Sequence, residues 1–325
     1  MKVSVIVPVY NVEAFIGRCA ISLMEQTLQE VEYIFVDDCS PDGSIAKLKE
    51  VIALYPHRTQ CVQIVSHLHN QGLPAARNTG LARAMGEYVF HCDSDDWVEK
   101  DMLEKLYAAA VEKEADMVWC DWYLSFEQNE RYMKQPDYAT AEEALKGMLA
   151  GTMKYNVWNK LVKRSLYTDN QIQFPQGYGM GEDMTMIRLA ACARRVAYVA
   201  QAFYHYIRLN TGAFTRAYSE KNLKDLRHNA DETMKFISQR AGDALGNEIA
   251  YFQLNTKFPF LITNDKQMYR LWNEWYPEAN SHILANPYVS VRFRLLQFAA
   301  AQKWYGLVGL YYVLVYKFIY GMIYK

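Results

Sequence analysis

The chain has no excess of charge of either sign. It carries 35 Lys and Arg against 36 Asp and Glu in 325 residues, so it lacks the basic surplus typical of nucleic-acid-binding proteins. Its six cysteines form no CxxC pair, so we expect no zinc site and interpret the thiols as reduced, in a cytosolic compartment. The first apolar run, in MKVSVIVPVYN, is short and ends at Pro8, so no signal peptide is expected.

The chain also has no internal repeat and no low-complexity segment. Its first part instead alternates short apolar runs with stretches of helical spacing. We predict strands at 3–9, 31–38, 61–67, 87–93 and 115–122, and helices at 13–26, 44–54, 72–85 and 100–113. Successive strand–helix units of this kind predict an α/β fold with a mostly parallel sheet covered by helices on both faces.

The pattern loosens after Trp122. TAEE at 140–143 is a capping box that opens a helix, and a glycine-rich loop at 174–181 leads into another. The run VAYVAQAFYHYI at 196–207 predicts one or two strands, and the sequence from Ser219 onward is almost wholly helical. We therefore expect a sheet domain at 1–215 and a helical C-terminal region at 216–325.

Carboxylates gather at the ends of the predicted strands. Asp37 and Asp38 end the second strand, and Asp93, Asp95 and Asp96 follow the fourth. In parallel sheets, ligands bind at this edge. Adjacent carboxylates repel one another, and a hard cation such as Mg²⁺ or Mn²⁺, shared with substrate phosphates, would offset the repulsion. A solvated acidic turn is the alternative reading of DSDD alone.

The order and spacing of several motifs favour a ligand site over a solvated acidic turn. VSVIVPVYN, VDDCSPDGS, NQGLPAARNTGL, HCDSDDW and GMGEDM follow one another along the chain. This series resembles that of family 2 glycosyltransferases, which are nucleotide-sugar-dependent enzymes with the GT-A fold. The resemblance covers residues 1–215. It implies an inverting enzyme, of hexosyltransferase type, that acts in the assembly of cell-surface polysaccharide.

The resemblance implies a donor site. Pro8 and Tyr10 match positions that line the nucleotide base, and Asp38 matches the acid that hydrogen-bonds the base, usually uracil. We therefore expect a UDP-linked donor. Arg77 matches an arginine near the diphosphate or the donor sugar. The resemblance also implies that Arg208 lies near the donor phosphates.

The resemblance also implies a metal site and a catalytic base. Asp93 and Asp95 match the two acids of the DXD motif, with Asp95 the preferred ligand of Mn²⁺ or Mg²⁺. His205 falls where some relatives place a further metal ligand. Asp183, in the segment GED, matches the catalytic base. A metal and an arginine would stabilise the departing diphosphate, while a carboxylate takes the proton of the acceptor hydroxyl.

The acceptor is expected to be a glycan or a lipid-linked molecule. Trp158, Lys160 and Glu182 are the candidate acceptor residues. Other readings stay open for several positions: Trp158 and His205 could be core residues, Asp183 could be a first-turn acid of a helix, and Asp101 could be a helix cap.

Two rival functions belong to other classes. A nucleotidyltransferase would normally carry a glycine-rich phosphate loop after the first strand, and PVYNVEAF is not such a loop. A non-catalytic sugar-binding protein would be favoured by loss of the acids, and the acids are present. The Q-x-x-R-W motif and transmembrane helices of processive synthases are missing, which favours transfer of one sugar at a time.

The C-terminal stretch has no acidic residue. From Ala279 to Lys325 the charged side chains are all basic: Arg292, Arg294, Lys303, Lys317 and Lys325. The apolar run from Trp304 to Tyr316 is shorter than the roughly 20 residues that a spanning helix needs. We predict a peripheral protein on the cytoplasmic face of the membrane, held at an anionic surface by an aromatic and basic tail. The alternative is a helix that packs on the protein or on another subunit.

Overall fold

The computed structural model describes residues 1–207 and 219–315. The chain divides into two compact units, Met1–Leu145 with Tyr155–Phe236, and Lys146–Lys154 with Ile237–Lys325. The predicted boundary between residues 215 and 216 lies outside the described residues.

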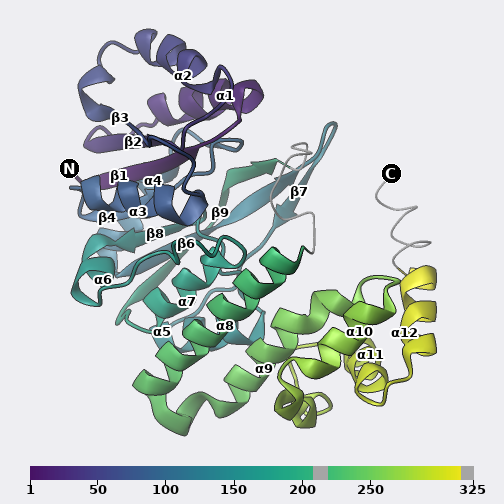
Figure 1. Cartoon of the computed structure of the whole chain (residues 1–325). Helices are drawn as coiled ribbons and strands as arrows, with labels where there is room; N and C mark the ends of the chain where they lie inside the picture. Colours follow the sequence, from purple (N-terminus) through teal and green to yellow (C-terminus); the bar gives the residue numbers. More distant parts are fainter. Residues whose placement is uncertain (208–218, 316–325) are drawn as a thin grey trace. The chain divides into compact units, whose positions relative to one another are not determined.

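The first unit is built on one nine-stranded sheet (Figure 1), in the order β3-β2-β1-β4-β8-β6-β9-β5, with β7 beside β6. Its strands are β1 Val3–Val9, β2 Val31–Asp37, β3 Val62–Ser66, β4 Tyr88–His91, β5 Trp97–Val98, β6 Met117–Ser125, β7 Glu130–Met133, β8 Lys160–Lys163 and β9 Val196–Ile207. The predicted α/β fold is confirmed. The sheet is mixed, however, rather than mostly parallel.

The parallel part of the sheet is β3-β2-β1-β4, together with the pair β6 and β9. Between these parts lies β8, which is antiparallel to both β4 and β6, while β5 and β7 are antiparallel to β9 and β6. Sequence periodicity did not predict β5, β7 or β8, and it carries no information about strand partners. The strand β8 begins 69 residues beyond the end of β4 (91 to 160).

Helices cover both faces of the parallel part. Val3, Val5, Val7 and Val9 share a buried core with side chains of α1 (Glu13–Met24), α2 (Ser44–Ala53) and α4 (Met102–Glu112). On the other face, α3 (Leu73–Arg83) comes so close to β1 that a Cβ on Gly80 would lie 2.3 Å from Ile6 Cγ2. Such alternation along β1 is typical of a strand buried on both sides.

The remaining helices of this unit include one, at residues 164–169, that the sequence did not predict. They are α6 Arg164–Asp169, the 3₁₀ turn η2 Glu182–Met184, α7 Thr185–Ala190 and the first part of α8 Glu220–Ala241. The predicted capping box is also confirmed at the start of α5 (Ala141–Ala150), where the Glu143 N–H donates to Thr140 Oγ1 at 3.1 Å and the Thr140 N–H donates to Glu143 Oε2 at 3.2 Å.

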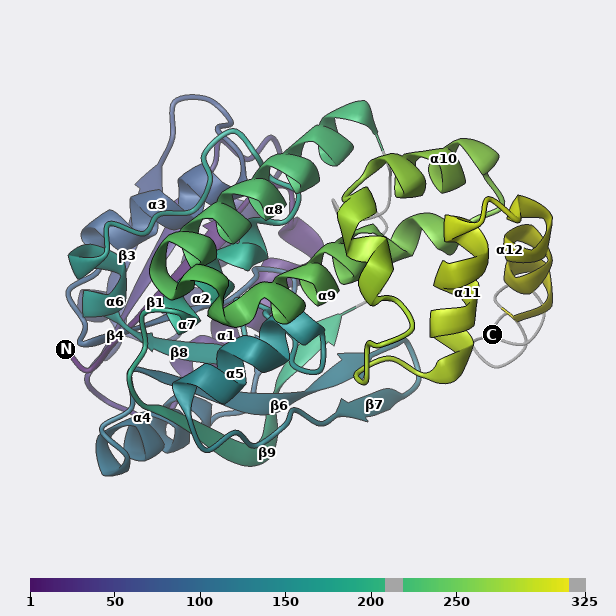
Figure 2. The same ribbon diagram turned by 90° about the horizontal axis from the view of Figure 1, so that it is seen from below.

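The second unit is helical, as predicted (Figure 2). Its helices after α8 are α9 Gly246–Lys257, α10 Lys266–Glu274, α11 Val291–Ala301 and α12 Tyr305–Tyr311. At its centre the fully buried Lys257 ammonium donates to Trp275 O, Tyr276 O and Asn280 Oδ1 and lies 4.1 Å from the centroid of the Trp272 ring. Within the described residues, no helix is long and apolar enough to span a bilayer.

Candidate active site

Three of the predicted donor residues, Tyr10, Asp38 and Asp93, follow the parallel strands β1, β2 and β4. These strands are neighbours, so the three residues lie at the same end of the strands. Pro8 lies inside β1, buried and opposite Val36. Tyr10 lies just past the strand and is 48% exposed. Of the two residues predicted to line the base, Tyr10 is therefore open to solvent and Pro8 is buried, and contact of either with a base remains a prediction.

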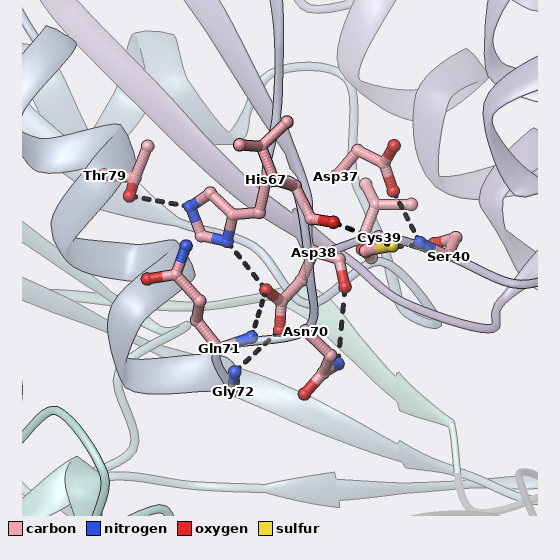
Figure 3. Close-up of polar contacts among 11 residues, drawn as sticks. Asp37, Asp38, Cys39, Ser40, His67, Asn70, Gln71, Gly72 and Thr79 are labelled. Carbon is pink, nitrogen blue, oxygen red and sulfur yellow. Dashed lines mark hydrogen bonds and ion pairs between the residues drawn. The ribbon is translucent and has the colours of Figure 1, made fainter.

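Asp38 is the centre of a hydrogen-bonded network (Figure 3). Its carboxylate accepts from the Gln71 N–H (2.8 Å) and the Gly72 N–H (2.8 Å) and pairs with His67 Nδ1 at 2.7 Å. The other His67 nitrogen lies 2.9 Å from Thr79 Oγ1. Asp38 is only 3% exposed, so it anchors the backbone just before α3, and its predicted contact with a base remains a prediction.

The turn SPDGS is stabilised by two other aspartates, Asp37 and Asp42. Asp37 Oδ1 accepts from the Ser40 N–H at 2.9 Å (Figure 3). Asp42 accepts from the N–H groups of Glu13 and Ser44 and from the Ser44 hydroxyl. Asp38 therefore does not cap this turn.

Arg77 joins the donor-side acids to the GED segment. The guanidinium is 1% exposed, and its Nη2 lies 3.0 Å from Asp93 Oδ1 and 3.6 Å from Glu182 Oε1. Burial disfavours the cation, yet the attraction of Asp93, Glu182 and Asp183 raises the pKa of Arg77 above its usual value. The Arg77 side chain is therefore a buried bridge between two predicted parts of the site, and not part of a solvated helix face.

The GED carboxylates have raised pKa values. Burial, reinforced by the charge of Asp183, raises the pKa of Glu182 to about 8. Burial also raises the pKa of Asp183 to about 6, opposed by Arg77 and Lys160 and reinforced by Asp93. A carboxyl with a pKa near the working pH is suited to accept a proton and to release it again.

Lys160 shares this environment. It is 1% exposed, and its ammonium donates to Asn156 O at 2.9 Å and to Asn159 Oδ1 at 2.8 Å. Burial lowers the pKa of Lys160 to about 7, against the attraction of Asp183. Trp158, two residues earlier, is 6% exposed and stacks on Tyr204 and Tyr206, so it packs in the core and its contact with an acceptor remains a prediction.

The DSDD turn is held by β9. The Tyr204 hydroxyl accepts from the Asp93 N–H (3.1 Å) and donates to Asp96 Oδ2 (2.7 Å), and Asp96 Oδ1 accepts from the Ile207 N–H (2.7 Å). Asp96 is 1% exposed, whereas Asp93 and Asp95 are half-buried. Asp96 is thus a structural anchor, whereas Asp93 and Asp95 are partly exposed, and their binding of a metal or donor remains a prediction.

Tyr204 could not be identified as a site residue from the sequence. It is one of 25 tyrosines, and its partner Asp96 is 108 residues away along the chain. Asn78 was also missed: its side chain donates to Phe174 O and accepts from the Phe174 N–H, both at 2.8 Å. The neighbouring Arg77 in the AARN segment could have indicated it.

His205 is a fully engaged side chain. Its Nδ1 lies 2.7 Å from Glu130 Oε1 and its Nε2 lies 3.1 Å from Glu99 Oε1. The ring stacks on Trp97, with 3.4 Å between centroids, and is 3% exposed. These contacts match the alternative of a satisfied core histidine, and ligation of a metal by His205 remains a prediction. Arg208 lies outside the described residues.

Asp101 differs from its expected role as a cap. It precedes α4, but its side chain makes no capping hydrogen bond and instead pairs with Lys105 Nζ at 2.7 Å. Lys105 lies one helical turn after Asp101, and both side chains are partly exposed. A surface ion pair therefore takes the place of the expected capping hydrogen bond.

The acids after β4 fit a cation that is shared with phosphate. Residues 1–207 and 219–315 contain no group of three or more His, Cys, Asp or Glu placed to hold a metal. Mg²⁺ needs no such group, because it commonly takes one or two carboxylates and completes its shell with substrate phosphates and water, and carboxylates suit Mn²⁺ equally. Asp93 and Asp95 form a donor set of that kind.

Comparison with known proteins agrees with this arrangement. Residues 4–184 match the family described as Glycosyl transferase family 2. The chain is 33% identical to EpsH of Bacillus subtilis over 67% of the chain and 64% of EpsH. It is 34% identical to the glycosyltransferase GlyA of Streptococcus pneumoniae over 68% of the chain but 32% of GlyA. The chain therefore spans less than two thirds of the length of these two relatives.

Solved structures show the same fold. S. aureus TarS 1–349 in complex with UDP-GlcNAc superposes with a TM-score of 0.65 at 20% identity, over 96% of this chain and 91% of that one. The mannosyltransferase PcManGT from Pyrobaculum calidifontis, in complex with GDP-Man and Mn²⁺, superposes with a TM-score of 0.54 at 16% identity, over 96% and 87%. At these identities the likeness establishes the GT-A fold alone.

Proposed function

Since the chain belongs to glycosyl transferase family 2, we propose that it moves a single sugar from a UDP-linked donor to a hydroxyl group of a glycan or lipid-linked acceptor, in the assembly of cell-surface polysaccharide. One observation carries the proposal most strongly. Buried Arg77 lies between Asp93, on the donor side, and Glu182, beside the predicted base Asp183. The groups proposed to bind the donor and to accept the proton thus belong to one electrostatic cluster, which supports the proposal.

The proposed reaction is a single displacement with inversion. The acceptor hydroxyl oxygen attacks the anomeric carbon and its proton passes to a carboxylate oxygen of Asp183, while the bond from that carbon to the diphosphate oxygen breaks and UDP leaves. The pKa of Asp183, about 6, leaves most of the base ionised at neutral pH. Arg77 adds positive charge to the wall of the site as the diphosphate departs.

The donor is proposed to contact Pro8, Tyr10, Asp38 and Arg208, with Lys160 and Glu182 on the acceptor side. Asp95, assisted by Asp93, would hold Mn²⁺ or Mg²⁺. When bound, the metal supplies positive charge that offsets the charge on the leaving diphosphate.

Attachment to an anionic membrane, on the cytoplasmic face, is a further part of the proposal. On α11 the exposed apolar side chains Val291 and Leu295 are one turn apart, and Leu307 and Leu310 share the spacing of one face on α12. Every charged residue from 279 to 325 is basic. Apolar and basic side chains together suit an interface that contains anionic lipid.

A panel of nucleotide sugars tests the proposal. Ligand-induced thermal shift with Mn²⁺ should select a UDP-sugar, because bound ligand stabilises the folded state by mass action. Release of UDP from that donor should then fall by orders of magnitude in Asp183→Asn, while the thermal shift by UDP is retained. A variant with near-normal turnover would remove Asp183 from the role of base. Binding of UDP-sugars without release of UDP by the wild type would favour the non-catalytic alternative.

A further inference from the structure

The loop that precedes the GED segment rests on α8. Two side chains one helical turn apart, Asp225 and Asn229, bind it through backbone groups. Asn229 Nδ2 donates to Tyr178 O at 3.0 Å and to Met180 O at 2.9 Å, and Asp225 Oδ2 accepts from the Gly179 N–H at 3.0 Å. Backbone groups of three successive residues, Tyr178, Gly179 and Met180, are therefore held by one face of one helix.

These two side chains are buried where they make this contact, and Asp225 Oδ2 also accepts from Lys221 Nζ at 2.8 Å. Each is 3% exposed, and neither is part of a motif in the sequence. A second contact supports the same placement, since the Tyr178 ring stacks on His228 with 3.6 Å between centroids. Buried polar side chains are costly unless their hydrogen bonds are made, so the loop and the helix stabilise each other.

The bound segment leads directly into the proposed base. Gly181 adopts φ +88°, a left-handed conformation, and the turn η2 with Glu182 and Asp183 begins at the next residue. Upstream, Asn78 fixes Phe174 by two hydrogen bonds of 2.8 Å. Between these anchors, Gly177 also has a positive φ and no atom within 4 Å of its Cβ position.

Part of this segment is not backed by a packed core. A polar cavity of about 170 Å³ lies between Pro175, Gly181 and α7 on one side and His228, Glu232 and Thr233 of α8 on the other. Figures 1 and 2 both show α8 alongside α7. Because a cavity offers little van der Waals support, the hydrogen bonds from Asp225 and Asn229, together with the stacking of Tyr178 on His228, contribute to the positioning of the loop.

We propose that Asp225 and Asn229 are positioning residues for Asp183: they fix the backbone at 178–180 and so hold the base at the acceptor side of the site. The inference rests on the proposed function, because it assigns to the loop a place beside the acceptor hydroxyl. We call the hydrogen bonds from Asp225 and Asn229 to the loop the clamp. Displacing a catalytic group by about 1 Å can cost about 10²-fold in rate, so loss of the clamp should be visible in turnover.

Variants of the full-length protein test the clamp. Asn229→Asp keeps the shape but turns a carboxylate oxygen toward two carbonyl oxygens, and Asp225→Ala removes the acceptor of the Gly179 N–H. Asp225→Asn retains an acceptor oxygen and is the conservative rescue. Asp231→Ala is the matched control, because Asp231 is 46% exposed and pairs with Arg227 along the helix at 2.9 Å.

Two measurements are made on each variant: the rate of UDP release from UDP-GlcNAc and other UDP-sugars with Mn²⁺, and the affinity for UDP. We expect Asn229→Asp and Asp225→Ala to lose about 10²-fold in rate with unchanged UDP affinity, and Asp225→Asn and Asp231→Ala to resemble the wild type. Hydrogen exchange of the peptide at 174–184 should accelerate in the first two variants only.

Normal rates in Asn229→Asp and Asp225→Ala would overturn the inference. So would a parallel loss of UDP affinity and rate, because that pattern reports general unfolding. A wild-type protein that neither binds UDP nor releases it would instead refute the proposed function. In that case hydrogen exchange at residues 174–184 would test the clamp by itself, and unaltered exchange in Asp225→Ala would overturn the inference.

Discussion

Replacing Asp38 by asparagine separates an architectural role from a ligand-binding one. The carboxylate accepts two peptide N–H groups at 2.8 Å and pairs with His67 at 2.7 Å, so both oxygens are in use. Asparagine keeps one acceptor oxygen and places an NH₂ group where the other oxygen was. At least one backbone N–H, that of Gly72 or Gln71, would then face a donor in a buried position.

The size of the effect follows from these contacts. A hydrogen bond to a charged group contributes about 1.5–3 kcal/mol and an unsatisfied buried donor costs about 1–3 kcal/mol, so Asp38→Asn should lower the free energy of unfolding by about 2.5–6 kcal/mol. Asp38 is 3% exposed, so solvent screens little of this. A loss of that size is a large fraction of the roughly 5–15 kcal/mol that stabilises a domain.

Urea denaturation measures the loss, and Asp37→Asn is the matched control. Asp37 accepts the Ser40 N–H at 2.9 Å through one oxygen, which asparagine can supply, so its loss should stay near or below about 1 kcal/mol. The reasoning would be refuted if Asp38→Asn unfolded at the same urea concentration as the control and lost only affinity for UDP. Asp38 would then act on the base and not on the loop before α3.

Three further predictions concern the metal, the base and the tail. Asp95→Ala should weaken Mn²⁺-dependent binding of UDP far more than Asp101→Ala, whose carboxylate pairs with a surface lysine; equal losses by calorimetry would count against the metal site. The kcat/KM for UDP release should fall as the pH drops through about 6, since the base acts as a carboxylate, and Lys160→Met should move this limb to higher pH by removing a cation that lowers the pKa of Asp183. If the acidic limb of the pH profile stayed at the same pH in Lys160→Met, coupling between Lys160 and Asp183 would be excluded. Deleting 303–325 should release the protein from anionic vesicles in a sedimentation assay while UDP binding survives; a truncated protein that no longer folds would favour packing of the tail.

The alternation of strands and helices and the place of the acids could be predicted from the sequence. Runs such as VSVIVPV have the local period of a buried strand, and the ends of parallel neighbours meet at one edge, so Asp38, Asp93 and Asp95 could be assigned to that edge. The capping box before α5 is likewise a local pattern, and its two hydrogen bonds join residues three apart in the chain.

Long-range pairing was decided only by the tertiary structure. The insertion of antiparallel β8 between β4 and β6 turned an expected parallel sheet into a mixed one, because strand partners depend on how distant segments pack. The same holds for the site: Arg77 meets Glu182, Tyr204 meets Asp96, and Asn229 meets the loop before Asp183, across 105, 108 and 49–51 residues of chain. Local periodicity carries no information about such contacts, since they arise from burial of charge and from hydrogen bonds that exist only once the chain has folded.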